Sequence, residues 1–231
     1  MNHRAEPSAT AIAAGFHARF GSQPRLFRAP SRVNMIGEYT DFNDGFVLPV
    51  AMALYSWVAI APRLDRIVRA YSAHFDEQIE IDLGSLERRP GDHWSNYLLA
   101  VLAMLQEAGH AVGGADLVIR GDIPLGGGLS SSASLEVALA TAFLAVAGTR
   151  LDARRVALLC QRAESEFVGV RCGIMDQYVI ACSDAGKAML LDCRSVTHQS
   201  LPLPESVRML VVHSGVRRQL QDGAYNRRRE E

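Results

Sequence analysis

The chain has 231 residues, of which 48% are hydrophobic, and its 24 basic and 25 acidic side chains nearly cancel. This length and composition predict a globular protein with one large domain, or one domain and part of another. The balanced charge argues against a nucleic-acid partner or an anionic membrane surface. With no apolar run long enough for a signal peptide or a membrane span, we expect a cytoplasmic protein.

The first half of the chain predicts one helix followed by strands. Residues 8–20 follow Pro7 and begin with Ser8, a favourable N-cap, so we expect a short helix there. Further on, the stretches are rich in β-branched and aromatic residues or alternate apolar with acidic residues. They predict strands over 54–62, 67–75 and 77–83.

The second half of the chain mixes helices and strands. Apolar residues at helical spacing, with Leu135, Leu139, Phe143 and Val146 as one buried face, predict a helix over 130–147. Other helices are expected over 94–109, from about 152 onward, and, as an incomplete start, over 222–231. Strands are expected over 115–124, 188–195 and 207–215. Because the elements do not alternate strictly, we predict an α+β fold, with a mixed sheet packed against helices, and not a doubly wound sheet.

The stretch "PLGGGLSSSAS", residues 124–134, joins a strand to a helix through a glycine-rich loop. The first N–H groups of a helix have no partner within it, and the helix dipole adds about half a positive charge there. Glycines let the backbone curl around an anion, and serines add hydroxyl donors or a ligand for Mg²⁺. The loop lacks the lysine of a Walker A motif. A flexible loop with a serine cap is the alternative, but three serines exceed what a cap needs.

Several stretches carry a family resemblance. "PLGGGLSSSAS" resembles the phosphate-binding motif of the GHMP kinase superfamily. "RAPSRVNMIGEYTDFNDGFVLPVAM" (28–52) is very similar to the galactokinase signature, and "CGIMDQ" (172–177) and residues 213–231 also follow that family's pattern. The resemblance implies a GHMP-kinase N-terminal lobe, of the ribosomal protein S5 domain 2-like fold, over 1–204. It implies the start of an incomplete C-terminal domain over 205–231, with the second lobe largely absent.

The same resemblance implies a reaction. The γ-phosphoryl group of MgATP would pass to the anomeric hydroxyl of galactose, with Asp176 as the base and Arg32 as its cationic partner. Such a transfer needs an acceptor for the hydroxyl proton and positive charge near the reacting oxygens. The alternative role for Asp176 is to cap a helix that begins at "DQYVIA".

The resemblance also implies a sugar site. Its residues would be Glu38, Tyr39, Asp41, Gly173, Asp176 and Tyr225. Carboxylates accept hydrogen bonds from sugar hydroxyls, although two acids in a glycine- and asparagine-rich segment are also ordinary turn residues. The family usually has histidine where this chain has Tyr39, which leaves the exact sugar open. It commonly has glycine where this chain has Ser31.

For the nucleotide, the resemblance implies contacts from one continuous loop. These residues are Gly126, Gly127, Gly128, Leu129, Ser130, Ser131, Ser132 and Ala133. Magnesium prefers hard oxygen ligands, and the implied ligands are Ser132 and Glu164. Helical geometry alone does not separate Glu164 from Glu166, and Ser131 is an alternative to Ser132.

Two other functions stay open at this stage. One is a non-enzymatic sensor of galactose and ATP, and the other is a kinase for another sugar, such as N-acetylgalactosamine or arabinose. Family members are considerably longer than this chain. We therefore expect residues 1–231 alone to be weakly active or inactive, and to need a separate C-terminal lobe as a partner.

Overall fold

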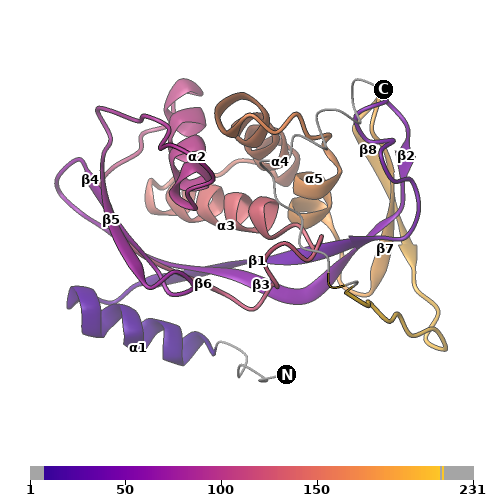
Figure 1. Ribbon diagram of the computed structural model, residues 1–231, viewed down its shortest axis with the longest axis horizontal. Helices are drawn as coiled ribbons and strands as arrows, with labels where there is room; N and C mark the ends of the chain where they lie inside the picture. Colours follow the sequence, from indigo (N-terminus) through magenta and orange to yellow (C-terminus); the bar gives the residue numbers. More distant parts are fainter. Residues whose placement is uncertain (1–7, 214, 216–231) are drawn as a thin grey trace.

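The computed structural model describes residues 8–213 and residue 215. Its centre is one eight-stranded sheet. Helices α2, α3, α4 and α5 cover one face of this sheet, and helix α1 lies against the other face (Figure 1). All strand pairs are antiparallel except β4 with β6. The predicted α+β fold, with a mixed sheet packed against helices, is confirmed.

The elements have the following bounds. The strands are β1 (Arg25–Asn34), β2 (Phe46–Val47), β3 (Pro49–Pro62), β4 (Ile67–Ser72), β5 (Glu77–Asp82), β6 (Ala115–Gly121), β7 (Lys187–Asp192) and β8 (Thr197–Pro202). The helices are α1 (Ala9–Phe20), α2 (Ser95–Glu107), α3 (Ser131–Val146), α4 (Ala153–Arg162), the π-helix η1 (Ala163–Val168) and α5 (Met175–Cys182). The sheet order is β2-β7-β3-β6-β4-β5, with β1 paired to β3 and β8 paired to β7.

Helix α1 has the start and stop signals that its sequence predicted. The Ser8 hydroxyl accepts a hydrogen bond from the N–H of Ala11 (3.1 Å), as an N-cap does. Gly21 ends the helix in the left-handed conformation, with φ of 75°, which glycine adopts without a Cβ clash. Ile12 and Phe16 are buried and hold the helix to the outer face of the sheet.

Helix α3 is buried on more sides than the single apolar face that the sequence predicted. Figure 1 shows it between the sheet and helices α2, α4 and α5. Leu139 and Phe143 are buried as expected, but residues on the other sides of the helix, such as Ala133 and Val137, are buried too. A helix that is apolar nearly all round belongs in a core. One of its fully buried residues is an acid, Glu136.

Most predicted strands are confirmed, and three strands were missed: β1, β8 and β2, which has only two residues. Strands β1 and β8 have weak sequence signals, because β1 contains three arginines and a proline, and β8 is largely polar. The strand expected over 207–215 is wrong: residues 207–213 form no strand and are exposed. An extended segment needs a partner strand for its backbone groups, and within the described residues this segment has none.

Several sequence-based predictions concern the C-terminal end. The boundary expected after residue 204 comes just after β8 and stays a prediction. The described residues form a single lobe. The helix expected over 222–231 and the candidate sugar ligand Tyr225 lie outside the described residues.

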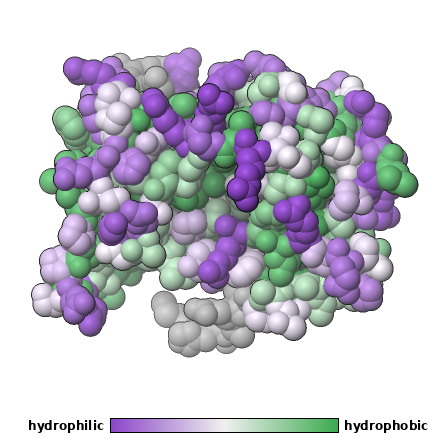
Figure 2. Space-filling view, turned by 180° about the vertical axis from the view of Figure 1, so that it is seen from behind, coloured by the Kyte–Doolittle hydropathy of each residue, from purple (hydrophilic) through white to green (hydrophobic). Residues whose placement is uncertain are grey.

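On the face opposite to that of Figure 1, the surface has no long band that is purely hydrophobic or purely hydrophilic. Figure 2 shows hydrophilic residues spread over this face between smaller apolar patches. Among the described helices, none combines the length and the apolar character that crossing a membrane requires.

Candidate active site

Arg32 reaches the site from strand β1, just after an irregularity in that strand. The pairing of β1 with β3 shifts register between Pro30 and Ser31. Such a bulge is tolerated because Pro30 has no N–H and because β1 pairs with only one other strand. Bulges re-aim the side chains that follow them. Here the bulge directs Arg32 towards the helices that carry the other site residues.

Asp176 is the main partner of Arg32. Arg32 Nε donates to Asp176 Oδ1 (2.7 Å) and Arg32 Nη2 donates to Oδ2 (2.6 Å). The third guanidinium nitrogen, Nη1, donates to the carbonyl of Gly128 (2.8 Å). Paired bonds from a planar guanidinium fix both the distance and the plane of a carboxylate. Both side chains are partly exposed, 13% for Arg32 and 25% for Asp176, so the pair is accessible from solvent.

The capping role for Asp176 is wrong. Helix α5 begins at Met175, its N-cap residue is Ile174, and no side chain caps it. Asp176 lies in the first turn, where the positive end of the helix dipole favours a negative charge. Its oxygens are instead used by Arg32 and by Ser130.

Ser130 links the glycine-rich loop to Asp176. Its hydroxyl donates to Asp176 Oδ2 (2.6 Å). Ser130 has a positive φ of 58°, a conformation that non-glycine residues rarely adopt and that concentrates at functional sites. The serine-cap alternative is also wrong, because Ser130 occupies the N-cap position of α3 but makes no side-chain cap bond. The first N–H groups of α3 therefore have no side-chain cap and face the loop.

The loop before α3 has the backbone freedom that the sequence predicted. Gly126 and Gly128 both have positive φ, of 70° and 74°. Gly127 packs close to the carbonyl of Pro124 and to the ring of His213. Leu129 and Ala133 are buried under the helix start.

Asp41 is a buried carboxyl group close to Asp176. Only 8% of the residue is exposed, and Gly173 lies so close that a Cβ there would collide with the Asp41 carboxyl. Burial, and then the negative charge of Asp176, raise the pKa of Asp41 to about 6. The sequence-predicted residues Asp41, Gly173 and Asp176 are therefore neighbours.

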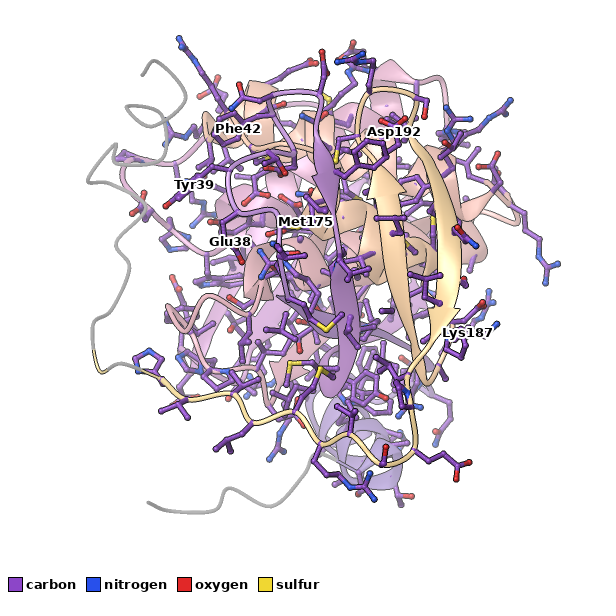
Figure 3. The ribbon with its side chains drawn as sticks, turned by 90° about the vertical axis from the view of Figure 1, so that its right-hand side faces the viewer. Glu38, Tyr39, Phe42, Met175, Lys187 and Asp192 are labelled. Atoms are coloured by element: carbon purple, nitrogen blue, oxygen red, sulfur yellow. The ribbon has the colours of Figure 1, made fainter. Side chains whose placement is uncertain are left out.

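Glu38 and Tyr39 lie in the loop between β1 and β2. Figure 3 shows both side chains on the same side of the molecule as Met175, at the start of α5. Asn34 Nδ2 donates to Glu38 Oε1 (3.2 Å), a contact that the sequence did not predict. Tyr39 has a positive φ of 62° and is 42% exposed, and its ring meets the edge of Phe42. The loop thus presents Glu38 and Tyr39 outward, next to Asp41.

Glu164 and Glu166 have different environments. Glu166 is exposed and pairs with Arg162 (2.9 Å). Glu164 is only 4% exposed, in the π-helix η1, and lies next to Ser132. Burial and the charge of Asp176 raise the pKa of Glu164 to about 7. Of the two acids left open by helical geometry, Glu164 is the one beside the serine loop.

Ser132 and Glu164 supply two adjacent hard oxygens, and this pair suits Mg²⁺. Magnesium usually keeps waters and substrate phosphates as its other ligands, so one or two protein oxygens suffice. Within the described residues, no group of three or more His, Cys, Asp or Glu side chains could hold a metal alone. This arrangement fits a metal that arrives with a nucleotide.

Two buried residues that sequence reasoning missed lie behind Glu164. Gln177 Nε2 donates to Glu164 Oε2 (2.6 Å) and to Glu136 Oε2 (3.1 Å). Glu136 is fully buried, and burial, together with the charge of Glu164, raises its pKa well above its usual value. A signal existed: Glu136 is an isolated acid in an apolar run, one helical turn after Ser132.

A cavity of about 720 Å³ lies elsewhere, between α3, α4, α5 and strand β1. Three arginines line it, Arg25, Arg28 and Arg150, over an apolar floor that includes Val137 and Leu144. None of the sequence-predicted site residues that the structure describes lines this cavity. The cluster around Asp176 is therefore a partly exposed surface of the lobe and not the lining of this cavity.

The chain matches two family models. Residues 96–184 match the model described as GHMP kinases N terminal domain. Residues 14–62 match the galactokinase galactose-binding signature. These two segments contain Arg32, the serine loop, Glu164 and Asp176.

Curated relatives align with nearly all of the chain. A galactokinase of Chloroflexus aggregans is 47% identical over 219 residues, which cover 94% of this chain and 56% of the relative. A galactokinase of a Roseiflexus species is 46% identical, with 94% and 55% covered. The chain thus spans about half the length of the curated relatives that it matches.

Solved structures show the same fold. The Lactococcus lactis galactokinase complexed with galactose superposes with a TM-score of 0.81 at 34% identity, over 84% of this chain and 52% of that one. The Methanococcus jannaschii mevalonate kinase superposes with a TM-score of 0.65 at 20% identity, over 79% and 56%. At that lower identity the likeness shows the fold alone.

Proposed function

Because this chain belongs to the galactokinases of the GHMP kinase family, as an N-terminal lobe, we propose that it phosphorylates the anomeric hydroxyl of galactose with ATP. We propose this activity for the chain acting with a C-terminal lobe of the galactokinase kind, since it spans about half the length of its curated relatives. The carrying observation is the contact of Asp176 with both Arg32 and Ser130, which joins the predicted base to the predicted phosphate loop.

In the proposed reaction, Asp176 accepts the proton of the sugar hydroxyl. A carboxylate has about four lone-pair positions. Arg32 uses two of these positions and Ser130 uses a third, which leaves one, on Oδ1, for the sugar hydroxyl. As the proton moves to Asp176, the sugar oxygen forms a bond to the γ-phosphorus. The bond from that phosphorus to the β,γ-bridging oxygen breaks, and its electron pair leaves with ADP.

Arg32 has two functions in this proposal. It orients the carboxylate of Asp176 through a pair of hydrogen bonds. Its positive charge also lies beside the loop that would hold the phosphates, because Nη1 bonds the carbonyl of Gly128. A fixed cation at that point stabilises negative charge on the transferring phosphoryl group.

Sugar binding is assigned to Asp41, Glu38 and Tyr39, with Gly173 allowing close approach. The buried Asp41 would accept hydrogen bonds from sugar hydroxyls in a site shielded from water, where such bonds are stronger. Glu38, held by Asn34, would accept another. The nucleotide phosphates would bind the loop from Gly126 to Ala133 at the uncapped start of α3.

Ser132 and Glu164 would hold Mg²⁺, and its charge would offset that of the ATP phosphates. Glu164 must be ionised to do so. Burial and the charge of Asp176 raise its pKa to about 7, and the charge of a bound cation would favour the ionised form.

A kinase for another sugar is the second candidate. Tyr39 supports it, because its ring is larger than the usual histidine and is held in a left-handed backbone conformation. A panel with galactose, N-acetylgalactosamine and arabinose would separate the two.

Two measurements test the proposal. Calorimetry on the 231-residue chain should show binding of galactose and of MgATP. A chimera should then release ADP at on the order of 1–100 per second with galactose. It would join this chain to the unmatched C-terminal part of the Chloroflexus aggregans galactokinase, with Asp176→Asn as the matched control.

The outcomes distinguish the alternatives. Galactose binding with no turnover in the chimera would favour the sensor, and turnover with another sugar alone would favour the second candidate. Full turnover by the Asp176→Asn chimera would remove Asp176 from its role.

A further inference from the structure

Glu136 is an acid in the middle of the hydrophobic core. It is 0% exposed, on a helix whose other buried residues are small or apolar. A buried acid without a cation costs stability compared with an apolar residue of the same size. Its position therefore calls for a reason other than packing.

The only hydrogen bond that Glu136 makes in the described lobe is with Gln177. Gln177 is also 0% exposed, and its single amide nitrogen donates to Glu136 Oε2 and to Glu164 Oε2. An amide nitrogen carries two hydrogens, so these two carboxyl groups use both. The second carboxyl oxygen of Glu136, Oε1, and the amide oxygen of Gln177, Oε1, are buried and have no partner among the residues that the structure describes.

These contacts close a ring through three elements. Glu164, in η1, also lies next to Ser132, at the start of α3. Ser132 and Glu136 are four residues apart on α3, so they share one face of that helix. The ring runs from Glu136 to Gln177, to Glu164, to Ser132 and back along α3.

We propose that Glu136 is a positioning residue for the magnesium site. By accepting one hydrogen of the Gln177 amide, it directs the other at Glu164 and so fixes the Glu164 carboxyl beside Ser132. This inference rests on the proposed function, because Glu164 and Ser132 are metal ligands only in that proposal.

The need for Glu136 follows from the geometry of Gln177. The amide oxygen of Gln177 has no hydrogen-bond partner, so it adds no restraint on the rotation of the amide. Without an acceptor at residue 136, one N–H would lie unpaired in the core, and an unpaired buried donor is costly. The amide would turn to reduce that cost, and Glu164 would lose the 2.6 Å bond that orients it. Groups that orient metal ligands typically change metal affinity by about 10- to 100-fold.

The test compares three variants of the chain. Glu136→Met removes the acceptor at similar volume, Glu136→Gln keeps an acceptor oxygen, and Gln177→Met removes the connecting amide. The probe is Mn²⁺ bound with a non-hydrolysable ATP analogue, followed by electron paramagnetic resonance. Galactose binding by calorimetry and the thermal midpoint are measured on the same samples.

We expect Mn²⁺ affinity to fall about 10- to 100-fold in Glu136→Met and in Gln177→Met. It should stay within about threefold of wild type in Glu136→Gln, because an acceptor remains. Galactose affinity should not change in any variant. A fourth variant that combines Glu136→Met with Gln177→Met should lose no more than either single variant, because both substitutions act through one chain of contacts.

Equal Mn²⁺ affinity in Glu136→Met and wild type would overturn this inference but leave the proposed function standing. Parallel losses of metal binding, galactose binding and thermal stability would also overturn it, since they indicate a purely structural role. If Glu136→Met does not fold, Gln177→Met must show the loss and Glu136→Gln must not. If folded wild type binds galactose but no Mn²⁺–nucleotide, the proposed metal site fails, and the inference fails with it.

Discussion

Two polar clusters lie next to each other in this lobe, and they differ in how well their atoms are satisfied. Around Asp176, a cation and a hydroxyl partner the carboxylate. Around Glu136, two carboxyl groups share one amide, and within the described part of the chain they have no cation partner and two oxygens have no hydrogen-bond partner. The first cluster is partly exposed and the second is buried.

This difference separates side chains that already have their charge partners from carboxyl groups that still lack one. The ion pair of Arg32 and Asp176 needs nothing further to hold its geometry. The carboxyl groups of Asp41 and Glu164 have raised pKa values, so the folded protein holds them at a cost. Such groups are typical of functional sites, where a ligand supplies the missing partner.

The largest effect should come from breaking the satisfied cluster. Arg32→Lys cannot make the paired bonds to Asp176 and also reach the Gly128 carbonyl. We expect turnover of the chimera to fall by on the order of 10³, measured by ADP release with galactose. Arg28→Lys is the matched control, because Arg28 is on the same strand but stacks over Tyr55 and Trp57. A loss of less than tenfold in Arg32→Lys would contradict the role of Arg32.

Asp41→Asn tests a carboxyl group that forms no ion pair of its own among the described residues. We expect galactose affinity to fall by roughly 10- to 100-fold, since a charged acceptor is lost. Stability should change in the opposite direction. A carboxyl group whose pKa is raised by folding adds stability at pH values below the pKa that it has in the unfolded chain. That stability is lost as the pH rises through the pKa that it has in the folded protein, here about 6.

The variant should therefore be more stable than wild type at pH 8, by roughly 2 kcal/mol, and the difference should shrink towards pH 5. Urea unfolding across this pH range measures it. Wild-type galactose affinity should itself weaken as pH falls below about 6, because Asp41 then becomes protonated. A pH-independent affinity would count against Asp41 as a sugar ligand.

Ser130→Ala removes one of the three hydrogen bonds to Asp176. The hydroxyl bonds a charged group, so we expect about a tenfold loss in turnover of the chimera. Ser130→Gly should show the same loss but higher stability, because glycine relieves the positive φ at this position. Unchanged turnover in both variants would show that the Ser130 bond does not contribute to catalysis.

The smallest effect concerns two fully buried serines, Ser31 on β1 and Ser134 on α3, which differ in their hydrogen-bond partners. Among the described residues Ser31 Oγ has no partner, whereas Ser134 Oγ donates to the Ala29 carbonyl (2.9 Å) and accepts from the Ser56 N–H (3.3 Å). We expect Ser31→Ala to raise the free energy of unfolding by about 0.5–1 kcal/mol, and Ser134→Ala to lower it by about 1–2 kcal/mol. Urea unfolding at pH 7 compares them, and a destabilised Ser31→Ala would break the comparison.

The limits of prediction follow from particular residues. Helix α1 was predicted to within a residue because its cap, its apolar face and its terminal glycine are all local signals. Strand β1 was missed because its arginines and proline hide the strand pattern, and the bulge that aims Arg32 is visible only in its pairing with β3. The segment over 207–213 has a strand sequence but no described partner.

The sequence by itself determined the kind of fold, the glycine-serine loop at a helix start, and, through its resemblance, the set of candidate residues. Those features depend on contacts within a few residues or on a continuous pattern. Tertiary structure alone decided that Ser130 bonds Asp176 and does not cap α3, that Glu164 and not Glu166 faces Ser132, and that Glu136 is buried against Gln177. Each of these depends on side chains from separate elements meeting in space, and the spacing of residues along the chain does not encode that meeting.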